Sequence, residues 1–494
     1  MFQFFRVSYR ISSQSTLCGQ LPAKRHLTKT MNPFFKNKTA ASTNLSALLA
    51  SLTVIPAAIL AVTGELRLAV PLLVGVTAVM TISLACILYV GERGRLTWSP
   101  TAILLVALLL RLLFLFAPPQ LSDDVYRYLW DGSNLITGIN PYATAPSKMT
   151  PSPALSPIHS RINHPDYVTI YPPMAQIIFG GGTVLGGSIT GLKAFLVMID
   201  IGLCALIIAM LKRLEVPAWK SVLYAWNPLP ILEIAGSGHV DGAGMALVLA
   251  ALYLLLDRNS VVRATTRNEP YLISGAFLAC AGLVKLLPFV FAPLLILLVP
   301  PGKRRYFIAG SIGTTTLLVT PFLPDLINIT SSLNSYANNW EFAGFAFTVL
   351  RAVTGSGALA RLMPSASFLL IACVTTYCLA QRLQQTRLSD SKALLTLKAC
   401  YVIACAFLLL TPTLQPWYAL SLAAFLPFCA GPTGLVLCWA VFLTYQVQIP
   451  YFILGQWHED PYVTAAVFLA PLTTWLLCKF FSNTFPQDTS AHPQ

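Results

Sequence analysis

Charged residues are scarce in this chain, and acidic residues are the scarcest. Only 10% of the 494 residues are charged, and 32 Lys and Arg outnumber 18 Asp and Glu, which gives a formal net charge of +14. Together with 56% hydrophobic residues, this composition excludes an ordinary soluble globular domain. The basic residues form short clusters between apolar runs, where they act as topology signals, so the charge implies no nucleic-acid partner.

Several motifs that carry common chemistry are missing. The sequence has no HExxH, no CxxC pair, no clustered His triad and no Gly-rich loop of the kind that cradles nucleotide phosphates. We therefore expect no metal and no cofactor, and any reaction must draw its energy from the substrate. One set of residues could still converge on a divalent cation, namely Asp123, Asp124, His239 and Asp241.

Long hydrophobic runs, in contrast, recur along almost the whole chain after residue 44. A spanning helix needs about 20 apolar residues. The sequence therefore predicts an all-α polytopic membrane protein, a bundle of about 12–14 transmembrane helices with juxtamembrane or re-entrant helices in outer loops. We expect two N-terminal helices in 45–98, a central module in 99–430, further helices in 431–480 and a disordered tail in 481–494.

The positions of Lys and Arg predict which side each loop faces. They place both termini in the cytoplasm and the loop after helix 99–117 outside. Residues 1–44 hold seven Lys or Arg and no acid, which is typical of a disordered cytoplasmic tail, with an organelle transit peptide as the alternative. The sequence leaves open whether Met1 or Met31 is the first residue.

The same assignment of sides predicts two irregular elements. Segment 171–189 must begin and end outside, so we expect a juxtamembrane or re-entrant helix there, in keeping with its prolines and glycines. Segment 271–300 must begin and end inside, so it should form two short helices that turn near Lys285. Interrupted helices of this kind often build polar sites within membranes.

Two adjacent acids, Asp123 and Asp124, follow helix 99–117 after a Pro-Pro pair. A partly desolvated carboxylate at the membrane surface has a raised pKa and can act as a base toward a hydroxyl. The alternative is that one of the two acids caps the helix that begins at Val125. For Asp124 both interpretations remain open, whereas for Asp123 we favour the catalytic one.

Other polar side chains gather on the same predicted side. Lys285 lies between apolar segments, where it either lines a cavity or snorkels to the surface. Arg127 and Asp131 lie four residues apart on one helix, where a surface ion pair is the simplest account. Arg111 and Asp200 stand inside apolar helices and need partners. The candidate substrate contacts are Asp131, Tyr142, His164, Tyr171, Asp241, Glu341 and Trp417.

A series of ordered motifs resembles a known superfamily. These motifs are SDDVYRYLWDG with GINPY, NHPD with TIYPPMAQ, AWNPLPILEIAGSGHVD, LVKLLPFVFAP and LTPTLQPWY. Between about residues 99 and 420 the chain is similar to bacterial GT-C integral-membrane glycosyltransferases, especially glycosyltransferase family 87 and mannosyltransferases that depend on polyprenol-phosphate mannose.

The resemblance implies inverting transfer of a hexose, with mannose favoured, from a polyprenyl-phosphate carrier to a glycan or glycolipid on the extracytoplasmic side of a bacterial inner or plasma membrane. Asp123 and Asp124 occupy the acidic motif of the first outer loop of the module in 99–430. Asp123 is then the general base, and Lys285, His239 and Arg127 are expected to bind the donor phosphate. A lipid-linked sugar flippase and an oligosaccharide ligase remain alternatives.

Overall fold

The computed structural model describes residues 33–96, 98–256, 268–386 and 388–484, which form helices and two isolated β-bridges at Thr413. The longer helices are α1 (Pro33–Val62), α2 (Val70–Gly91), α3 (Pro100–Leu115), α7 (Ile189–Arg213), α10 (Asp241–Leu255), α12 (Glu269–Val284), α14 (Arg304–Val319), α17 (Gly357–Gln385), α18 (Ser389–Leu410) and α23 (Pro461–Thr484). The shorter elements used below are α4 (Asp124–Ile136), α5 (Ser156–His159), α6 (Pro173–Val184), α8 (Val222–Ala225), α9 (Pro228–Pro230), η3 (Ile231–Gly236), η4 (Leu287–Phe291), α13 (Ala292–Leu298), α15 (Ile327–Asn339), α16 (Phe345–Thr354), η7 (Pro416–Ala419), α19 (Leu420–Ala423), α20 (Leu426–Cys429), α21 (Pro432–Ala440), η8 (Val441–Val447) and α22 (Gln448–Leu454).

Many of these helices are long and apolar enough to cross a membrane. Within the described ranges there are 7 such helices, or up to 9 if each of two bent helix pairs counts as one span. Four shorter apolar helices are 100–115, 269–284, 287–298 and 345–354. The predicted all-α multi-pass membrane fold is therefore confirmed. The number of hydrophobic helices reaches the expected 12–14 only when the four short helices are added to the candidate spans. The reason is that several apolar runs are bent or broken.

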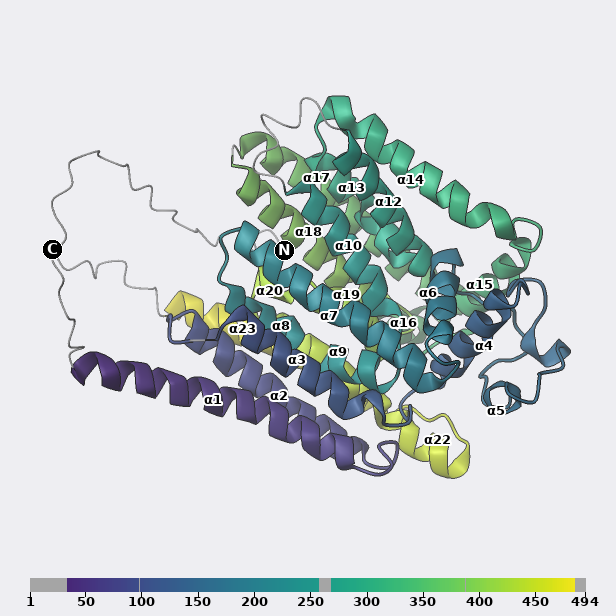
Figure 1. Cartoon of the computed structure of the whole chain (residues 1–494), viewed down its shortest axis with the longest axis horizontal. Coiled ribbons are helices and arrows are strands. Elements are labelled where there is room, and N and C mark those ends of the chain that lie inside the picture. Colours follow the sequence, from purple (N-terminus) through teal and green to yellow (C-terminus); the bar gives the residue numbers. More distant parts are fainter. Residues whose placement is uncertain (1–32, 97, 257–267, 387, 485–494) are drawn as a thin grey trace.

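Most long helices lie alongside one another, and many short elements gather at one end of the bundle (Figure 1). This end, which we call the site end, carries α4, α5, α6, α15, α16, α22 and the turn between α1 and α2. The arrangement concentrates short helices and connecting segments in one region.

The terminal segments are only partly described. Residues 1–32 and 485–494 lie outside the described ranges, so most of both predicted tails cannot be compared with the structure. Helix α1 begins at Pro33, which makes the last part of segment 1–44 helical. Helix α23 continues to Thr484, a few residues beyond the predicted end of the last hydrophobic run.

Both irregular segments contain short helices, as predicted, while the side of the membrane on which each begins and ends stays a prediction. Helix α6 is only 12 residues long and starts directly after Pro172. Helix α12 ends at Val284, and Lys285 adopts an extended conformation with φ −153° and ψ 144° before η4 begins. The chain therefore breaks at the residue where the sequence predicts a turn. A second break separates 228–236 from α10, with a bend of 120°.

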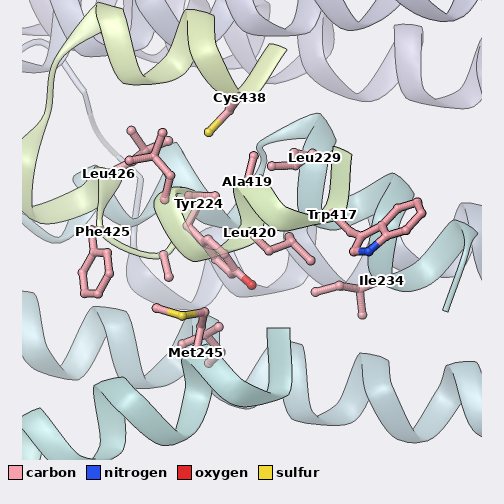
Figure 2. Close-up of a cluster of buried hydrophobic side chains, with 14 of the residues drawn as sticks. Tyr224, Leu229, Ile234, Met245, Trp417, Ala419, Leu420, Phe425, Leu426 and Cys438 are labelled. Atoms are coloured by element: carbon pink, nitrogen blue, oxygen red, sulfur yellow. The ribbon is translucent and has the colours of Figure 1, made fainter. Parts of the chain in front are cut away.

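A buried apolar cluster fixes this second break (Figure 2). It joins Tyr224, Leu229, Ile234 and Met245 to residues almost two hundred positions later in the chain, including Trp417. Segment 231–236 within it is a π-helix. Short π-helical segments are rare and occur often at functional sites. Segment η3 packs mainly on α3 and α7, and this packing holds the irregular backbone in place.

Arg111 and Asp200, which the sequence left without assigned partners, bind each other. Arg111 Nε lies 2.7 Å from Asp200 Oδ2, and both side chains are buried between α3 and α7. Tyr224 donates its hydroxyl to the other carboxylate oxygen, while Arg111 also donates to the Ala107 and Ala225 carbonyls. The pair is thus supported by further hydrogen bonds, which a buried ion pair requires to offset desolvation.

Candidate active site

The site end contains a cavity of about 1170 Å³ that brings together residues from most of the chain. Nine of the twelve predicted site residues line it: Asp123, Asp124, Arg127, His164, Tyr171, Asp241, Lys285, Glu341 and Trp417. The other three, Asp131, Tyr142 and His239, are buried behind its wall. Segments separated by up to three hundred residues therefore converge on one space.

The acidic pair stands at the start of α4. The helix begins at Asp124, and Asp123 occupies the position before it, yet the Asp123 side chain makes no capping hydrogen bond. The Ser122 hydroxyl instead accepts a hydrogen bond from the Asp124 backbone N–H at 3.3 Å. The capping alternative therefore does not account for the Asp123 carboxylate.

Asp123 keeps its carboxylate open to the cavity. Among the described residues no hydrogen-bond or ion-pair partner contacts this side chain, although Arg67 and Arg161 lie near enough to act on it electrostatically. Burial raises the pKa of Asp123 above its ordinary value, the Asp124 charge adds to this effect, and the two arginines oppose it. A carboxylate with free lone pairs and a raised pKa is suited to accept a proton.

Asp124 is held from two sides. Its Oδ2 accepts a hydrogen bond from the Tyr171 hydroxyl at 3.1 Å, and its Oδ1 accepts one from the Asn163 amide at 3.0 Å. The Tyr128 hydroxyl in turn donates to the Tyr171 hydroxyl at 3.0 Å. Asp124 is thus more constrained than Asp123, which suits it to orienting a substrate.

The loop that carries the acids is anchored by Lys193, a residue that the sequence analysis did not single out. Its buried ammonium donates to the Phe114 and Ala117 carbonyls at 2.9 and 2.6 Å, at the carboxyl end of α3. A cation suits helix carbonyls that lack intrahelical partners. The signal was present, since Lys193 is a lone cation inside an apolar helix, as Lys285 is between apolar segments.

Lys285 forms an ion pair on the wall of the cavity. Its Nζ lies 2.6 Å from Asp241 Oδ1 and 4.8 Å from the centre of the Tyr418 ring. The Lys285 side chain is 27% exposed, whereas the Asp241 side chain is 10% exposed. Asp241 Oδ2 is buried without a hydrogen-bond partner. The broken helix therefore presents an ammonium group to the cavity rather than to the surface.

Arg127 and Asp131 form an ion pair, but not on the surface. Arg127 Nε lies 2.8 Å from Asp131 Oδ1, with side-chain exposures of 8% and 1%, so the surface pair expected from the sequence is wrong. The reason is that α6 and the segment before it cover this face of α4. Arg127 also donates to the Tyr167 carbonyl at 3.0 Å, while its Nη2 is buried without a partner.

Asp131 and Tyr142 support the wall of the cavity and do not line it. The Tyr142 hydroxyl donates to the Tyr171 carbonyl at 2.7 Å, and Gln176 donates to the same carbonyl at 3.2 Å. Gln176 also lies 3.5 Å from Asp131. These contacts fix segment 167–171, from which Tyr171 reaches Asp124. The described structure therefore offers these two side chains no direct contact with a ligand in the cavity.

His239 lies behind Trp417. The two rings stack with centroids 3.8 Å apart, and the imidazole is fully buried. Its Nδ1 is 4.0 Å from Asp124 and its Nε2 is 3.6 Å from Glu233, whose carboxylate accepts the Tyr445 hydroxyl at 2.8 Å. His239 therefore lies between two carboxylates without a hydrogen bond from either ring nitrogen, and Trp417 separates it from the cavity.

Gly238 makes this close packing possible. It has φ +83°, in the left-handed region that favours glycine, and a Cβ here would lie 2.9 Å from a Val125 methyl group. Val125 follows the acidic pair directly. The backbone of the 236–241 turn thus approaches α4 closely enough to place His239 beside Asp124.

Aromatic and charged residues form another part of the cavity wall. His164 packs edge-on against Trp340 at 4.9 Å, and Glu341 pairs with Arg351 and Arg361. The Phe342 carbonyl accepts a hydrogen bond from the Leu414 N–H at 2.7 Å, which ties this segment to the one before Trp417. His164 and Glu341 are therefore held in place at the cavity surface.

The described residues contain no group of three or more His, Cys, Asp or Glu arranged to hold a metal ion. Three of the four side chains considered from the sequence meet other partners: Asp241 pairs with Lys285, Asp124 accepts hydrogen bonds from Tyr171 and Asn163, and His239 stacks on Trp417.

Comparison with known proteins identifies the family. The family model described as alpha-(1->6)-mannopyranosyltransferase, N-terminal domain, of the MptA/B family matches residues 17–301, more than half of the chain. Alpha-(1->6)-mannopyranosyltransferase A of Corynebacterium glutamicum is 28% identical over 156 residues, which cover 30% of this chain and 31% of the relative. The match thus spans less than a third of that curated protein. No solved structure matches the chain. The chain belongs to the MptA/B family of membrane mannopyranosyltransferases.

Proposed function

We propose that this protein is an α-(1→6)-mannosyltransferase that moves mannose from a polyprenyl-phosphate carrier to a glycan or glycolipid acceptor, with inversion at the anomeric carbon. The observation that carries the proposal is one cavity that holds an unpaired carboxylate, Asp123, together with a cation, Lys285. Membership of the MptA/B family supports the sugar and the linkage.

The reaction needs one base and one anion-binding group. Asp123 removes the proton from the acceptor hydroxyl while that oxygen forms a bond to the anomeric carbon. The bond between the anomeric carbon and the phosphate oxygen breaks, and the carrier leaves as polyprenyl phosphate. Lys285 stabilises the charge that develops on the phosphate. From a β-linked mannosyl donor this displacement gives an α-mannoside.

Apolar side chains of the same cavity support a lipid carrier. Beside Lys285 the wall is made by η4, α17 and α18, with Leu286, Val290, Phe368 and Phe407 among its residues. Leu369 lies in the same wall and is 61% exposed at the side of the bundle. A polyprenyl chain can lie along this surface with its phosphate at Lys285, because burial of apolar area favours such contact.

Other predicted residues take different roles in this proposal. Asp124, fixed by Tyr171 and Asn163, orients the acceptor. Arg127 is the second candidate for contact with the phosphate, since its Nη2 has no partner. Trp417 offers a ring to the sugar, and the His239 ring stacks behind it and supports its position. The site end faces the extracytoplasmic side in the orientation that the positive residues predict.

The test is sugar transfer by the purified protein in liposomes. Polyprenyl-phosphate mannose and polyprenyl-phosphate glucose are offered separately with an α-(1→6)-linked mannooligosaccharide acceptor. We expect mannose transfer by the wild-type protein and its loss in Asp123→Asn. If the wild-type protein transfers neither sugar but moves the lipid between leaflets, the transferase proposal fails and a flippase function takes its place.

A further inference from the structure

The two helices that precede the central module contribute directly to the cavity. Arg67, in the turn between α1 and α2, lines the same space as Asp123 and Lys285. Arg67 lies outside the central module predicted for residues 99–430, and the sequence alone indicates no role for it. The side chain is 26% exposed, so it is accessible from the cavity but not fully solvated.

Gln120 ties this turn to the acidic loop. Its amide donates to the Gly64 carbonyl at 2.6 Å, and its carbonyl accepts the Leu66 backbone N–H, also at 2.6 Å. On the other side of the loop, Gln448 of α22 donates to the Leu121 carbonyl at 3.3 Å. The position of Arg67 relative to Asp123 is therefore fixed by hydrogen bonds three residues before that acid.

The Arg67 guanidinium is itself held in place. It pairs with Glu65 at 3.1 Å and lies 5.0 Å from the centre of the Phe452 ring. Tyr451, which precedes Phe452 in α22, and Trp457 also line the cavity and are 48% and 49% exposed. Their rings pack edge-on at 5.6 Å. A cation and two accessible aromatic rings thus lie at this part of the cavity wall.

The cations of the cavity act on different acids. Among the charged groups, Arg67 has the largest electrostatic effect on Asp123, whereas Lys285 lies 2.6 Å from Asp241. Arg67 is therefore associated with the proposed base, and Lys285 with a separate acid of the cavity wall. Because an inverting displacement brings the nucleophile to the face of the sugar opposite the leaving group, donor phosphate and acceptor must approach from different sides.

We propose that Arg67, Tyr451 and Trp457 form the acceptor subsite, which binds the hexose chain whose hydroxyl is presented to Asp123. This inference rests on the proposed function, since it takes Lys285 as the donor phosphate site. The guanidinium provides several N–H donors for sugar hydroxyls. The amphipathic rings provide apolar faces for the sugar carbons and polar tips for its edges.

Binding measurements separate this subsite from the chemistry. In the Asp123→Asn background, which prevents turnover, binding of an α-(1→6)-linked mannooligosaccharide and of polyprenyl-phosphate mannose is measured separately. We expect Arg67→Ala to raise the acceptor Kd about tenfold or more, because a charged hydrogen bond is lost, and to leave the donor Kd unchanged. Trp457→Ala should have the same pattern. Arg93→Ala is the matched control, since Arg93 packs on Tyr89 at the opposite end of α2.

A second readout distinguishes Arg67 from a residue that merely stabilises the turn. The Arg67 charge lowers the pKa of Asp123, whereas Asp124 raises it and Arg161 lowers it. Arg67→Ala removes this charge, so the acid limb of the transfer rate should move to higher pH. Arg67→Lys keeps the charge, so the acid limb should stay in place. An Arg67→Ala protein that loses donor affinity and keeps acceptor affinity overturns the proposal. Transfer of glucose instead of mannose would overturn only the proposed donor sugar. The acceptor subsite would still stand, because acceptor binding is measured in the absence of any donor.

Discussion

Lys285 and Asp241 come from two different broken helices and meet at 2.6 Å on the wall of the cavity. Lys285 stands where α12 ends, and Asp241 is the first residue of α10. Each residue therefore satisfies the other at a point where the backbone is irregular. The pair links the two breaks that shape the cavity, so we expect loss of one partner to affect both the fold and the proposed donor site.

Replacement of Lys285 by Ala should weaken donor binding and lower thermal stability. The change removes the cation proposed to meet the phosphate and leaves Asp241 with no partner in a mostly buried position, at a cost of roughly 1–3 kcal/mol after allowance for partial exposure. The donor KM and the melting temperature in detergent measure the two effects.

The double variant Lys285→Ala with Asp241→Asn separates them. It removes the unpaired charge, so the melting temperature should recover while the donor KM stays high. Recovery of the KM together with the melting temperature would show that Lys285 acts only through the fold.

Replacement of Asp123 by Asn should abolish most transfer without loss of stability. A general base contributes about 10²–10⁴-fold to the rate, so a fall of that size is expected. Asp124→Asn is the comparison, because it also disturbs hydrogen bonds from Tyr171 and Asn163. If Asp124→Asn alone abolishes transfer at equal donor and acceptor occupancy, the base has been assigned to the wrong acid.

The rate of transfer should fall on the acid side at a pH above the ordinary Asp value. Burial raises the pKa of Asp123 from 3.8, and a base must be ionised to work. The unfolded chain then ionises first as pH rises, so Asp123 lowers the stability of the folded state above the unfolded pKa. Asp123→Asn should therefore melt at or above the wild-type temperature at neutral pH. If the acid limb of the transfer rate had an apparent pKa equal to the ordinary Asp value, the proposed effect of burial on Asp123 would be wrong.

The Arg111 and Asp200 pair should be more sensitive to loss of one partner than of both. Arg111→Leu leaves a buried carboxylate with only the Tyr224 hydroxyl, and breaking such a pair costs about 3–5 kcal/mol. Arg111→Leu with Asp200→Leu should regain much of that stability, because neither charge remains. Melting curves of the single and double variants in one detergent provide the measurement.

Part of the site could be predicted because it depends on local signals. The break at Lys285 follows from the sides assigned by basic residues, and the spacing of Arg127 and Asp131 places them on one helix face. The burial of that second pair could not be predicted, since it is produced by α6, which packs on α4 from beyond a long connection. Local spacing determines which residues can meet, and tertiary packing determines whether water reaches them.

Other relationships required three dimensions from the start. Arg111 and Asp200 are 89 positions apart, and the sequence gives no distance between two isolated charges. Arg67 was missed because a turn with one base and one acid looks like a solvated surface. His239 was expected in contact with a phosphate, but Trp417, far along the chain, covers it.

The Arg111–Asp200 pair also bears on how the chain enters the membrane. Helix α3 has only 16 residues and carries the Arg111 guanidinium. Its insertion into lipid by itself is therefore unfavourable in free energy. Its counter-charge arrives with α7, after the acidic loop and α6 have been synthesised. We expect α3 to be retained at the translocon until α7 emerges, so that the two helices leave together as a neutral pair and the acidic loop is already closed between them.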